Sequence, residues 1–266
     1  MDNLQKLLGR FPVRVSLGEA DMDAVIRKTV LRKSPTGQDA VRAMLNAHAG
    51  EISRQIHGSR LAHRQEDTED AVLDWPLLPS RRRVWERVLR ALDKTGLAGM
   101  LRTQMAVALA SARSVADRQL GWAVPADFLY SRFAEEAFAA GELPEETRAR
   151  IARLQQGGGA EDLQARVLML VYMLGLIQQD AETHGVRPTP EVIADLMVED
   201  LGNGAELRGE VPKAIAALAD EGRSSRSPCL ATSNQGKCRV GSPLPRRRAN
   251  TDPSNHGYCP RAQHRA

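Results

Sequence analysis

The spacing of apolar residues is the feature that most constrains how this chain can fold. Through the first 222 residues, apolar side chains recur at intervals of three and four, the period of a helix that buries one face. One short segment, Val13, Val15 and Leu17, alternates instead with the period of two that is typical of a strand. We therefore predict a mainly α-helical fold in which helices pack against helices, with one short strand near the N-terminus.

The same periodicity predicts where the helices lie. They are expected at residues 4–8, 21–33, 41–56, 80–92, 97–116, directly after Pro125, and at 144–156, 163–177, 189–197 and 206–220. Ser80 is expected to cap its helix through its hydroxyl, and Thr189 to start another. The stretch Gly58–Asp74 is polar and has no periodicity, so we predict a surface loop there, ending at the proline-rich anchor Trp75–Pro79.

Charge and composition divide the chain into parts. Residues 223–266 carry nine Lys and Arg against one Asp, a net charge of +8, whereas the preceding residues carry a net charge of −4. All three cysteines also fall in this basic tail. A second boundary is expected at Gly157–Gly159, because a glycine run ends a helix and forms a flexible joint. We predict three parts: residues 1–156, residues 160–222, and a disordered tail at 223–266.

Several classes of protein are excluded by missing sequence features. The longest apolar run, Val167–Ile177, is about half the roughly 20 residues needed to cross a bilayer. The N-terminal residues lack a basic stretch leading into an apolar one, so no secretory signal is indicated. These observations predict a cytoplasmic protein with no membrane partner.

No self-contained active site is visible. The chain has no Gly-x-x-x-x-Gly-Lys-[Ser/Thr] loop, no Gly-x-Gly-x-x-Gly and no Gly-x-Ser-x-Gly or His-Glu-x-x-His motif. Cys229, Cys238, Cys259, His256 and His264 are of the types that ligate zinc, but no Cys-x-x-Cys pair is present. We therefore predict no metal site and no enzyme activity for the chain on its own.

Two arginine runs are candidates for phosphate contacts. Arg81–Arg83 opens a helix whose apolar face is already used, so we interpret it as held by acidic neighbours in the protein rather than by nucleic acid. Arg246–Arg248 lies in the basic tail, which favours only a generic, salt-sensitive attraction to polyanions. Two single arginines, Arg10 and Arg102, stand between apolar neighbours, where the residue type alone favours a structural role.

Longer segments show a resemblance to a known family. Arg10-Phe11-Pro12 followed by Val13–Leu17 and Asp21–Lys28 resembles the last core strand and first lid helix of an AAA+ ATPase. Further segments resemble, in order, the large P-loop ATPases of BREX bacteriophage-exclusion systems, the BrxC family: Asp74–Glu86, Leu101–Gln104, Val115–Asp117 and Val124–Tyr130. The resemblance extends from Arg10 to about Gly222.

The resemblance implies a role for each part of the chain. Residues 1–156 would be the C-terminal strand and helical lid of an AAA+ module, and residues 160–222 a truncated winged-helix-like unit of three helices. Arg10 would match an arginine finger, the catalytic candidate, and Arg102 a lid arginine that senses the bound nucleotide. The full-length parent would bind ATP and Mg²⁺ through a P-loop and an acidic strand that this sequence lacks. Its partners would be other BREX proteins or copies of the parent ATPase, and DNA.

The chain departs from this family after Glu221-Gly222. The two apolar strands of a wing are expected there, and a stretch rich in Arg, Ser, Pro, Gly and Cys follows instead. We hypothesise that residues 223–266 come from a frameshifted or truncated gene, so that the chain is a fragment. Two alternative functions stay open: a standalone helical DNA-binding regulator that reads DNA with the helices from Thr189 onward, and a helical adaptor that binds only protein.

Overall fold

The structure is a computed structural model that describes residues 19–92, 100–178 and 184–224, with backbone alone at 19–22, 100–102 and 222–224. The predicted strand at 13–17, the short helix before it, Arg10 and the tail from 225 onward lie outside these described residues. Their structural predictions therefore stay predictions.

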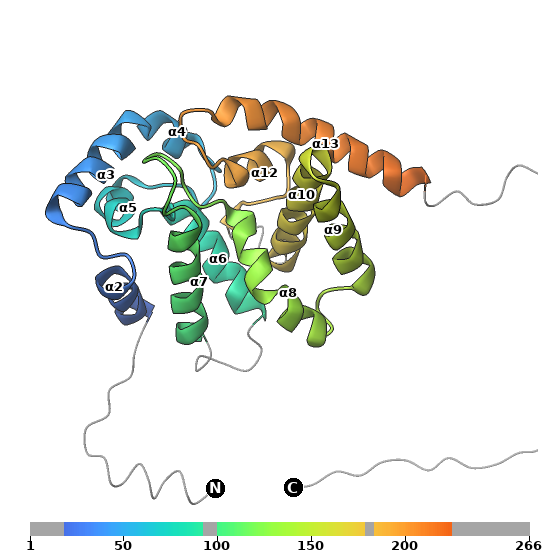
Figure 1. Cartoon of the computed structure of the whole chain (residues 1–266), viewed down its shortest axis with the longest axis horizontal. Coiled ribbons are helices and arrows are strands. Elements are labelled where there is room, and N and C mark those ends of the chain that lie inside the picture. The colour runs from blue at the N-terminus through green and yellow to red at the C-terminus, as the bar shows by residue number, and fades with distance from the viewer. Residues whose placement is uncertain (1–18, 93–99, 179–183, 225–266) are drawn as a thin grey trace, which may run out of the picture. The chain divides into compact units, whose positions relative to one another are not determined.

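The described residues are almost entirely helical, which confirms the predicted mainly α-helical class (Figure 1). The helices are α2 (Glu19–Thr29), α3 (Pro35–Ala47), α4 (Ala49–Arg54), α5 (Thr68–Asp74), α6 (Pro79–Leu92), α7 (Met100–Ser114), α8 (Tyr130–Ala139), α9 (Glu145–Gly157), α10 (Gly159–Leu176), α12 (Pro190–Met197) and α13 (Gly204–Ser224). Two short 3₁₀ helices, η1 (Gln65–Asp67) and η2 (Ala126–Leu129), precede α5 and α8. Within this part of the chain, β pairing is limited to one antiparallel bridge between Trp122 and Asp200.

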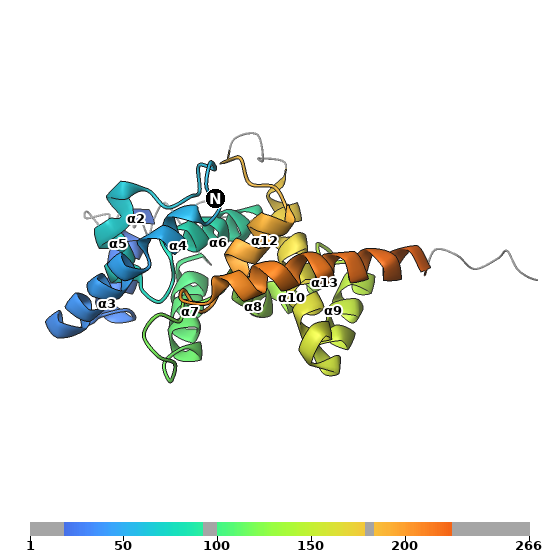
Figure 2. The same ribbon diagram turned by 90° about the horizontal axis from the view of Figure 1, so that it is seen from above.

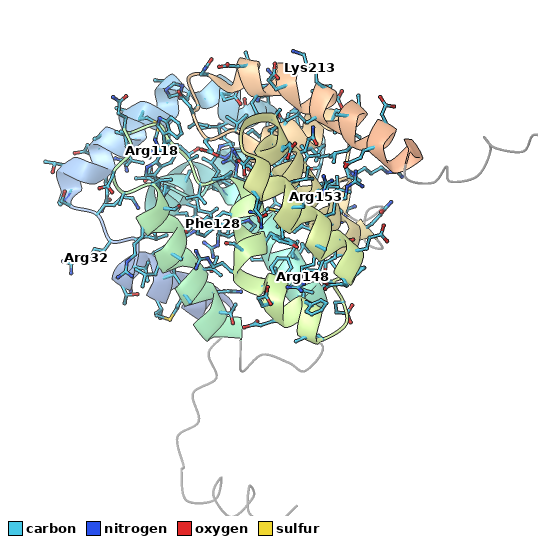
Figure 3. All side chains as sticks on the ribbon, turned by 45° about the vertical axis from the view of Figure 1, so that its right-hand side comes forward. Arg32, Arg118, Phe128, Arg148, Arg153 and Lys213 are labelled. Carbon is cyan, nitrogen blue, oxygen red and sulfur yellow. The ribbon has the colours of Figure 1, made fainter. Side chains whose placement is uncertain are left out.

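Most helices bury the face that their apolar spacing predicts, but α7 buries Val107 and Ala108 and leaves Leu109 40% exposed. On α6, Val84, Trp85, Val88 and Leu89 are buried at helical spacing. Many charged side chains lie on the outer faces, as the labelled Arg153 of α9 and Lys213 of α13 illustrate (Figure 3). No helix among the described residues is long and apolar enough to cross a bilayer.

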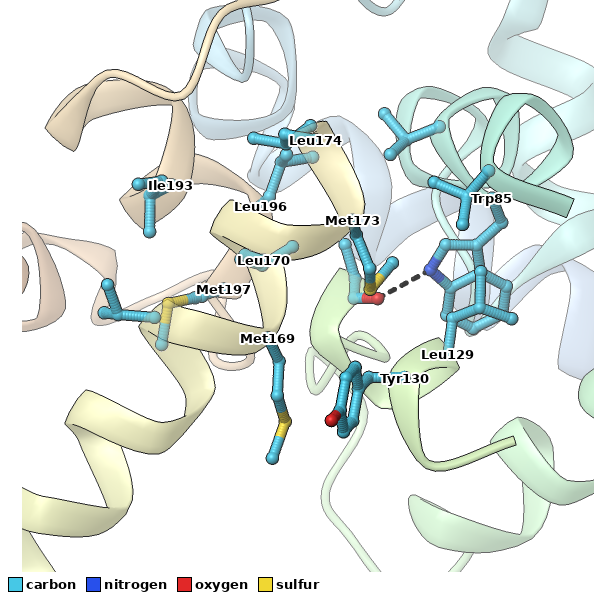
Figure 4. Packing of buried hydrophobic residues seen from close by; sticks show 14 of the residues in the cluster. Trp85, Leu129, Tyr130, Met169, Leu170, Met173, Leu174, Ile193, Leu196 and Met197 are labelled. Atoms are coloured by element: carbon cyan, nitrogen blue, oxygen red, sulfur yellow. Dashed lines mark hydrogen bonds between the residues drawn. The ribbon is translucent and has the colours of Figure 1, made fainter. Parts of the chain in front are cut away.

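Helix α10 lies at the centre of the main hydrophobic core. Its Leu170, Met173 and Leu174 are fully buried and pack in one cluster with residues of α6, η2, α8, α12 and α13 (Figure 4). Trp85 contributes its ring to this cluster and donates its indole N–H to the carbonyl oxygen of Ala126 at 2.8 Å. Helix α13 crosses α12 and α10 on the outside (Figure 2).

The glycine run between α9 and α10 forms a tight turn. Gly158 and Gly159 have φ angles of +68° and +53°, a conformation that glycine adopts without strain. The two helices joined by this turn pack against each other, and the main cluster includes Ile151 and Leu154 of α9 as well as α10. Residues on both sides of the glycines thus share a core, and the division into domains at 1–156 and 160–222 stays a prediction.

The prediction of a surface loop at Gly58–Asp74 is wrong. The second half of this stretch forms η1 and α5, and Leu61, Ala71 and Val72 are buried. The apolar residues are few because α5 is short, so periodicity could not reveal the helix. The polar residues are not all solvated either, since Asp67 and Asp74 are buried.

The helix starts were predicted with mixed success. The Thr189 hydroxyl accepts a hydrogen bond from the backbone N–H of Val192, which confirms the predicted start of α12. The predicted cap at Ser80 is wrong: α6 begins one residue earlier, at Pro79, and the buried Ser80 hydroxyl has no hydrogen-bond partner. Proline fits the first turn because the N–H it lacks would have had no helical partner.

Candidate functional site

The structure does not describe the side chains of the two arginines that the sequence singles out. Arg10 lies outside the described residues. Arg102 lies in the first turn of α7, but its side chain is not among those described. The proposed roles of both residues as arginine finger and nucleotide sensor therefore stay predictions.

The helices associated with these two arginines contact each other. Helix α2, which follows the Arg10 segment, packs against α7, which carries Arg102. Ile26 and Leu31 form a small buried cluster with Ala108 of α7, and Met105 and Ala112 pack against it. Segments about eighty positions apart in the sequence are thus brought together.

A cavity of about 50 Å³ lies between α2, α6 and α7. Apolar side chains such as Leu77 and Val107 form most of its lining, and Asp74, Arg82 and Glu86 contribute charges. Sites for organic ligands usually measure about 300–1,000 Å³. This cavity is therefore too small to hold a nucleotide.

The charged groups at this cavity satisfy one another. Arg82 pairs with Asp74 at 2.9 Å, with Glu86 at 3.1 Å and with Asp23. Arg27 donates to Asp74 at 2.6 Å and to Asp70 at 2.9 Å. The hydrogen bond to Asp74 raises the pKa of Arg27 above its usual range. The network ties α2 to α5 and α6.

The Arg81–Arg83 run is held inside the protein, as predicted. Arg82 pairs with the carboxylates just described, and Arg83 pairs with Asp67 and donates to the carbonyl oxygen of Ala62 at 2.8 Å. Arg81 differs from its two neighbours, because none of its hydrogen bonds goes to a carboxylate. It is completely buried and donates to backbone carbonyl oxygens and to the side-chain amide oxygen of Gln55.

Arg81 joins three distant segments of the chain. Its guanidinium donates to the carbonyl oxygens of Val124 at 2.6 Å, of Asp195 at 3.3 Å and of Val198. Burial lowers the pKa of Arg81 to about 10, against the opposing attraction of nearby carboxylates, of which Asp127 is the strongest. The group still carries its charge at neutral pH.

Two further arginines hold the carboxylates around Arg81. Arg166 pairs with Asp127 at 2.7 Å and with Glu199 at 2.6 Å. Arg208 pairs with Asp195 at 2.9 Å and with Glu51. Positive and negative groups therefore alternate across the interior, which is the arrangement that makes buried charge tolerable. No local sequence pattern indicates this network, because its members lie up to 157 positions apart.

A different kind of surface lies beside α2. Two adjoining hollows, of about 610 and 340 Å³, share Leu31, Arg32 and Lys33 in their linings. The first is also lined by Arg27 and Lys28, and the second by Arg118. We call Lys28, Arg32, Lys33 and Arg118 the basic surface. In Figure 3, Arg32 and Arg118 lie on the side of the molecule away from Arg148, Arg153 and Lys213.

Lys33 is held within the basic surface by backbone groups. Its ammonium group donates to the carbonyl oxygens of Leu31 and Leu73, both at 2.9 Å. Burial lowers the pKa of Lys33 to about 8, although Asp74 opposes the shift.

We expect Lys33→Met to change how stability depends on pH. The folded protein releases this proton near pH 8 and the unfolded chain only near 10.5, so the free energy of unfolding of the wild type rises with pH between these values. After a discount for solvent screening, the wild type should gain about 1–2 kcal/mol on the variant between pH 7 and pH 10. Urea titrations of both proteins across this range measure the difference, and a gap that does not vary with pH would contradict the assignment.

The helices from Thr189 onward present few cations. Ile193, Leu196 and Met197 of α12 are buried, so this helix exposes little side-chain surface. On these helices the exposed charged residues that the structure describes are Glu191, Glu206, Glu210, Lys213 and Asp220. A duplex would meet a mainly acidic surface there, which does not favour these helices as DNA readers.

Within the described ranges, no group of three or more His, Cys, Asp or Glu side chains is arranged to hold a metal ion. The cysteines and the histidines of the tail lie outside those ranges. No known protein family matches this chain, and no solved structure matches it. The fold and the sites define a mainly α-helical protein with an internally paired polar core and a basic surface beside α2.

Proposed function

We propose that this chain is the helical lid region of a BREX-type P-loop ATPase, joined to a winged-helix-like unit, and that it acts in the cytoplasm without catalytic activity of its own. The observation that carries the proposal is the packing of α2 on α7. In the family that the chain resembles, the segments that match those of Arg10 and Arg102 contact the same nucleotide. Helix α2 follows the Arg10 segment and α7 carries Arg102, so the contact between α2 and α7 supports that arrangement.

The nucleotide itself belongs to another part of the proposed parent. The described residues offer neither a metal-ligand cluster nor, between α2, α6 and α7, a cavity of nucleotide size. By the resemblance, ATP and Mg²⁺ would be bound by the parent's P-loop and acidic strand. Arginine suits the role proposed for Arg10 and Arg102, because its guanidinium is always charged and its fork matches phosphate oxygens.

The internal ion pairs support a structural contribution from the rest of the chain. The ion pairs of Arg27 and Arg82 hold α2 against α5 and α6. Residues of α7 line the same small cavity as residues of α2 and α6. An arginine on α7 that positions a phosphate would need a helix supported in this way, because a reacting group must be held in a defined geometry. The charged groups of Arg27, Arg82 and Asp74 hold α2, α5 and α6 together.

We expect Arg102→Ala to abolish most ATP turnover in the parent ATPase. The parent is obtained by extending the reading frame into the upstream DNA until a P-loop sequence is included. Loss of a phosphate-contacting arginine should lower kcat at least about 10-fold, with the melting temperature almost unchanged. Arg113→Ala, an exposed residue near the end of the same helix, is the matched control and should keep its activity.

Two outcomes would contradict the proposal. If the upstream DNA encodes no P-loop in any reading frame, the proposed parent ATPase does not exist. Calorimetry that shows saturable, one-to-one binding of Mg-ATP to the isolated chain would mean that the nucleotide site lies within it. A DNA-binding regulator that reads with the helices from Thr189 onward is the less favoured alternative, because most exposed charges that the structure describes there are acidic.

A further inference from the structure

The basic surface is built without carboxylates. The two hollows beside α2 are lined by five cations, Arg27, Lys28, Arg32, Lys33 and Arg118, and by no Asp or Glu. The hollows share Leu31, Arg32 and Lys33 in their linings, so they lie side by side. By contrast, the hollow beside α13 is lined by Glu199, Asp200, Glu206 and Glu210. The two surfaces therefore differ in sign, and the basic one is complementary to an anion.

The charge of the basic surface is largely uncompensated. Elsewhere in the described ranges most arginines are paired, as Arg82, Arg166 and Arg208 show. Lys28 and Arg32 are exposed, and neither has an acidic partner among the described residues. Arg27 is balanced by Asp70 and Asp74, so Lys28, Arg32, Lys33 and Arg118 supply the net charge. Uncancelled charge in a depression attracts a polyanion more strongly than charge on a flat surface.

An aromatic side chain lies next to the cations. The guanidinium carbon of Arg118 stands 4.9 Å from the centre of the Trp122 ring, and both residues line the second hollow. Leu120 in the same lining is 51% exposed. Aromatic side chains and arginine planes stack on unpaired bases, and every base offers such a face. Cations beside a stacking platform therefore favour a single-stranded nucleic acid.

We propose that the basic surface binds a single-stranded nucleic acid, with Lys28, Arg32 and Lys33 on the phosphates and Arg118 and Trp122 against a base. This site is independent of the proposed role at a nucleotide and would stand if that role failed. Its cations lie on α2, in the turn after it and in the loop after α7, not on α12 and α13, which the sequence had suggested as the DNA-binding part; Trp122 also lines the hollow beside α13.

Binding of a fluorescein-labelled oligo-dT strand of twelve nucleotides to the full chain tests the proposal. The triple variant Lys28→Gln/Arg32→Gln/Arg118→Gln should bind at least about 10-fold more weakly at low salt. Because two of the three substitutions, at Lys28 and Arg32, remove phosphate contacts, the slope of log affinity against log salt should fall by about 1.4. The matched control Arg148→Gln/Arg153→Gln/Lys213→Gln removes the same charge from the side of the molecule away from Arg32 and Arg118 (Figure 3) and should bind like the wild type.

Further readouts separate this site from general attraction to the basic tail. Oligo-dT should quench tryptophan fluorescence in the wild type, and Trp122→Phe should lose most of the quenching, because Trp75 and Trp85 are buried. Equal losses of affinity in the two triple variants would overturn the proposal, since tail binding would then dominate. So would tighter binding of a DNA duplex or of poly-glutamate than of oligo-dT.

Discussion

Replacement of Arg81 by Met is expected to lower the free energy of unfolding by about 3–5 kcal/mol. Methionine fills a similar volume but donates no hydrogen bonds, so the buried carbonyl oxygens of Val124, Asp195 and Val198 lose a shared donor. The nearby carboxylates of Asp127 and Glu199 also lose a neighbouring positive charge. The penalty is large because water cannot reach this completely buried position to replace the lost partner.

Differential scanning calorimetry measures this effect. For a folded part of this size, the expected loss corresponds to a fall in melting temperature of roughly 6–20 °C. Arg187→Met removes an arginine that is exposed in the loop before α12 and should shift the melting temperature by no more than about 1–2 °C. If Arg81→Met has the same melting temperature as the wild type, the guanidinium does not hold the segments around Val124, Asp195 and Val198 together.

The fold class could be predicted from the sequence because a helix that buries one face has apolar residues every three or four positions. Val84, Trp85 and Val88 recur at the helical period, and the structure buries all three on α6. The Thr189 hydroxyl likewise acts on its own local backbone, so its role could be predicted from neighbouring residues.

The failed prediction at Gly58–Asp74 has the opposite cause. Asp67 and Asp74 look like surface residues in the sequence, but Arg83, Arg82 and Arg27 bury their carboxylates. These arginine partners lie on α2, before the stretch, and on α6, after it, so no local sequence pattern indicates the ion pairs. The neighbours Arg81, Arg82 and Arg83 likewise meet different partners, because successive positions of a helix point in different directions.

The candidate sites were only partly predictable. Arg10 and Arg102 come from a resemblance, and neither side chain is among those described. The basic surface was missed because it joins α2 and the turn after it to Arg118 in a distant loop. A local signal existed: Arg27, Lys28, Arg32 and Lys33 place four cations within seven positions. The contribution of Trp122 could not be foreseen, since its contact with this surface depends on tertiary packing.

Loss of Arg208 should destabilise the protein almost as much as loss of Arg81. Arg208 on α13 pairs with Glu51 of α4 and with Asp195 of α12, and all three side chains are at most 15% exposed. Arg208→Met leaves two carboxylates together in a poorly solvated place, which costs about 3–5 kcal/mol. It also frees the end of α13 nearest α4 from the rest of the fold.

A double-mutant cycle separates this ion pair from simple packing. Glu51→Gln removes one of the two carboxylates that Arg208→Met leaves unpaired, so the double variant should be more stable than the sum of the single losses predicts, by about 1–2 kcal/mol. Chemical unfolding of the four proteins at neutral pH supplies the coupling energy. Strictly additive losses would show that Arg208 stabilises the protein through its aliphatic stem, and that Glu51 and Arg208 do not hold α4 to α13 by charge.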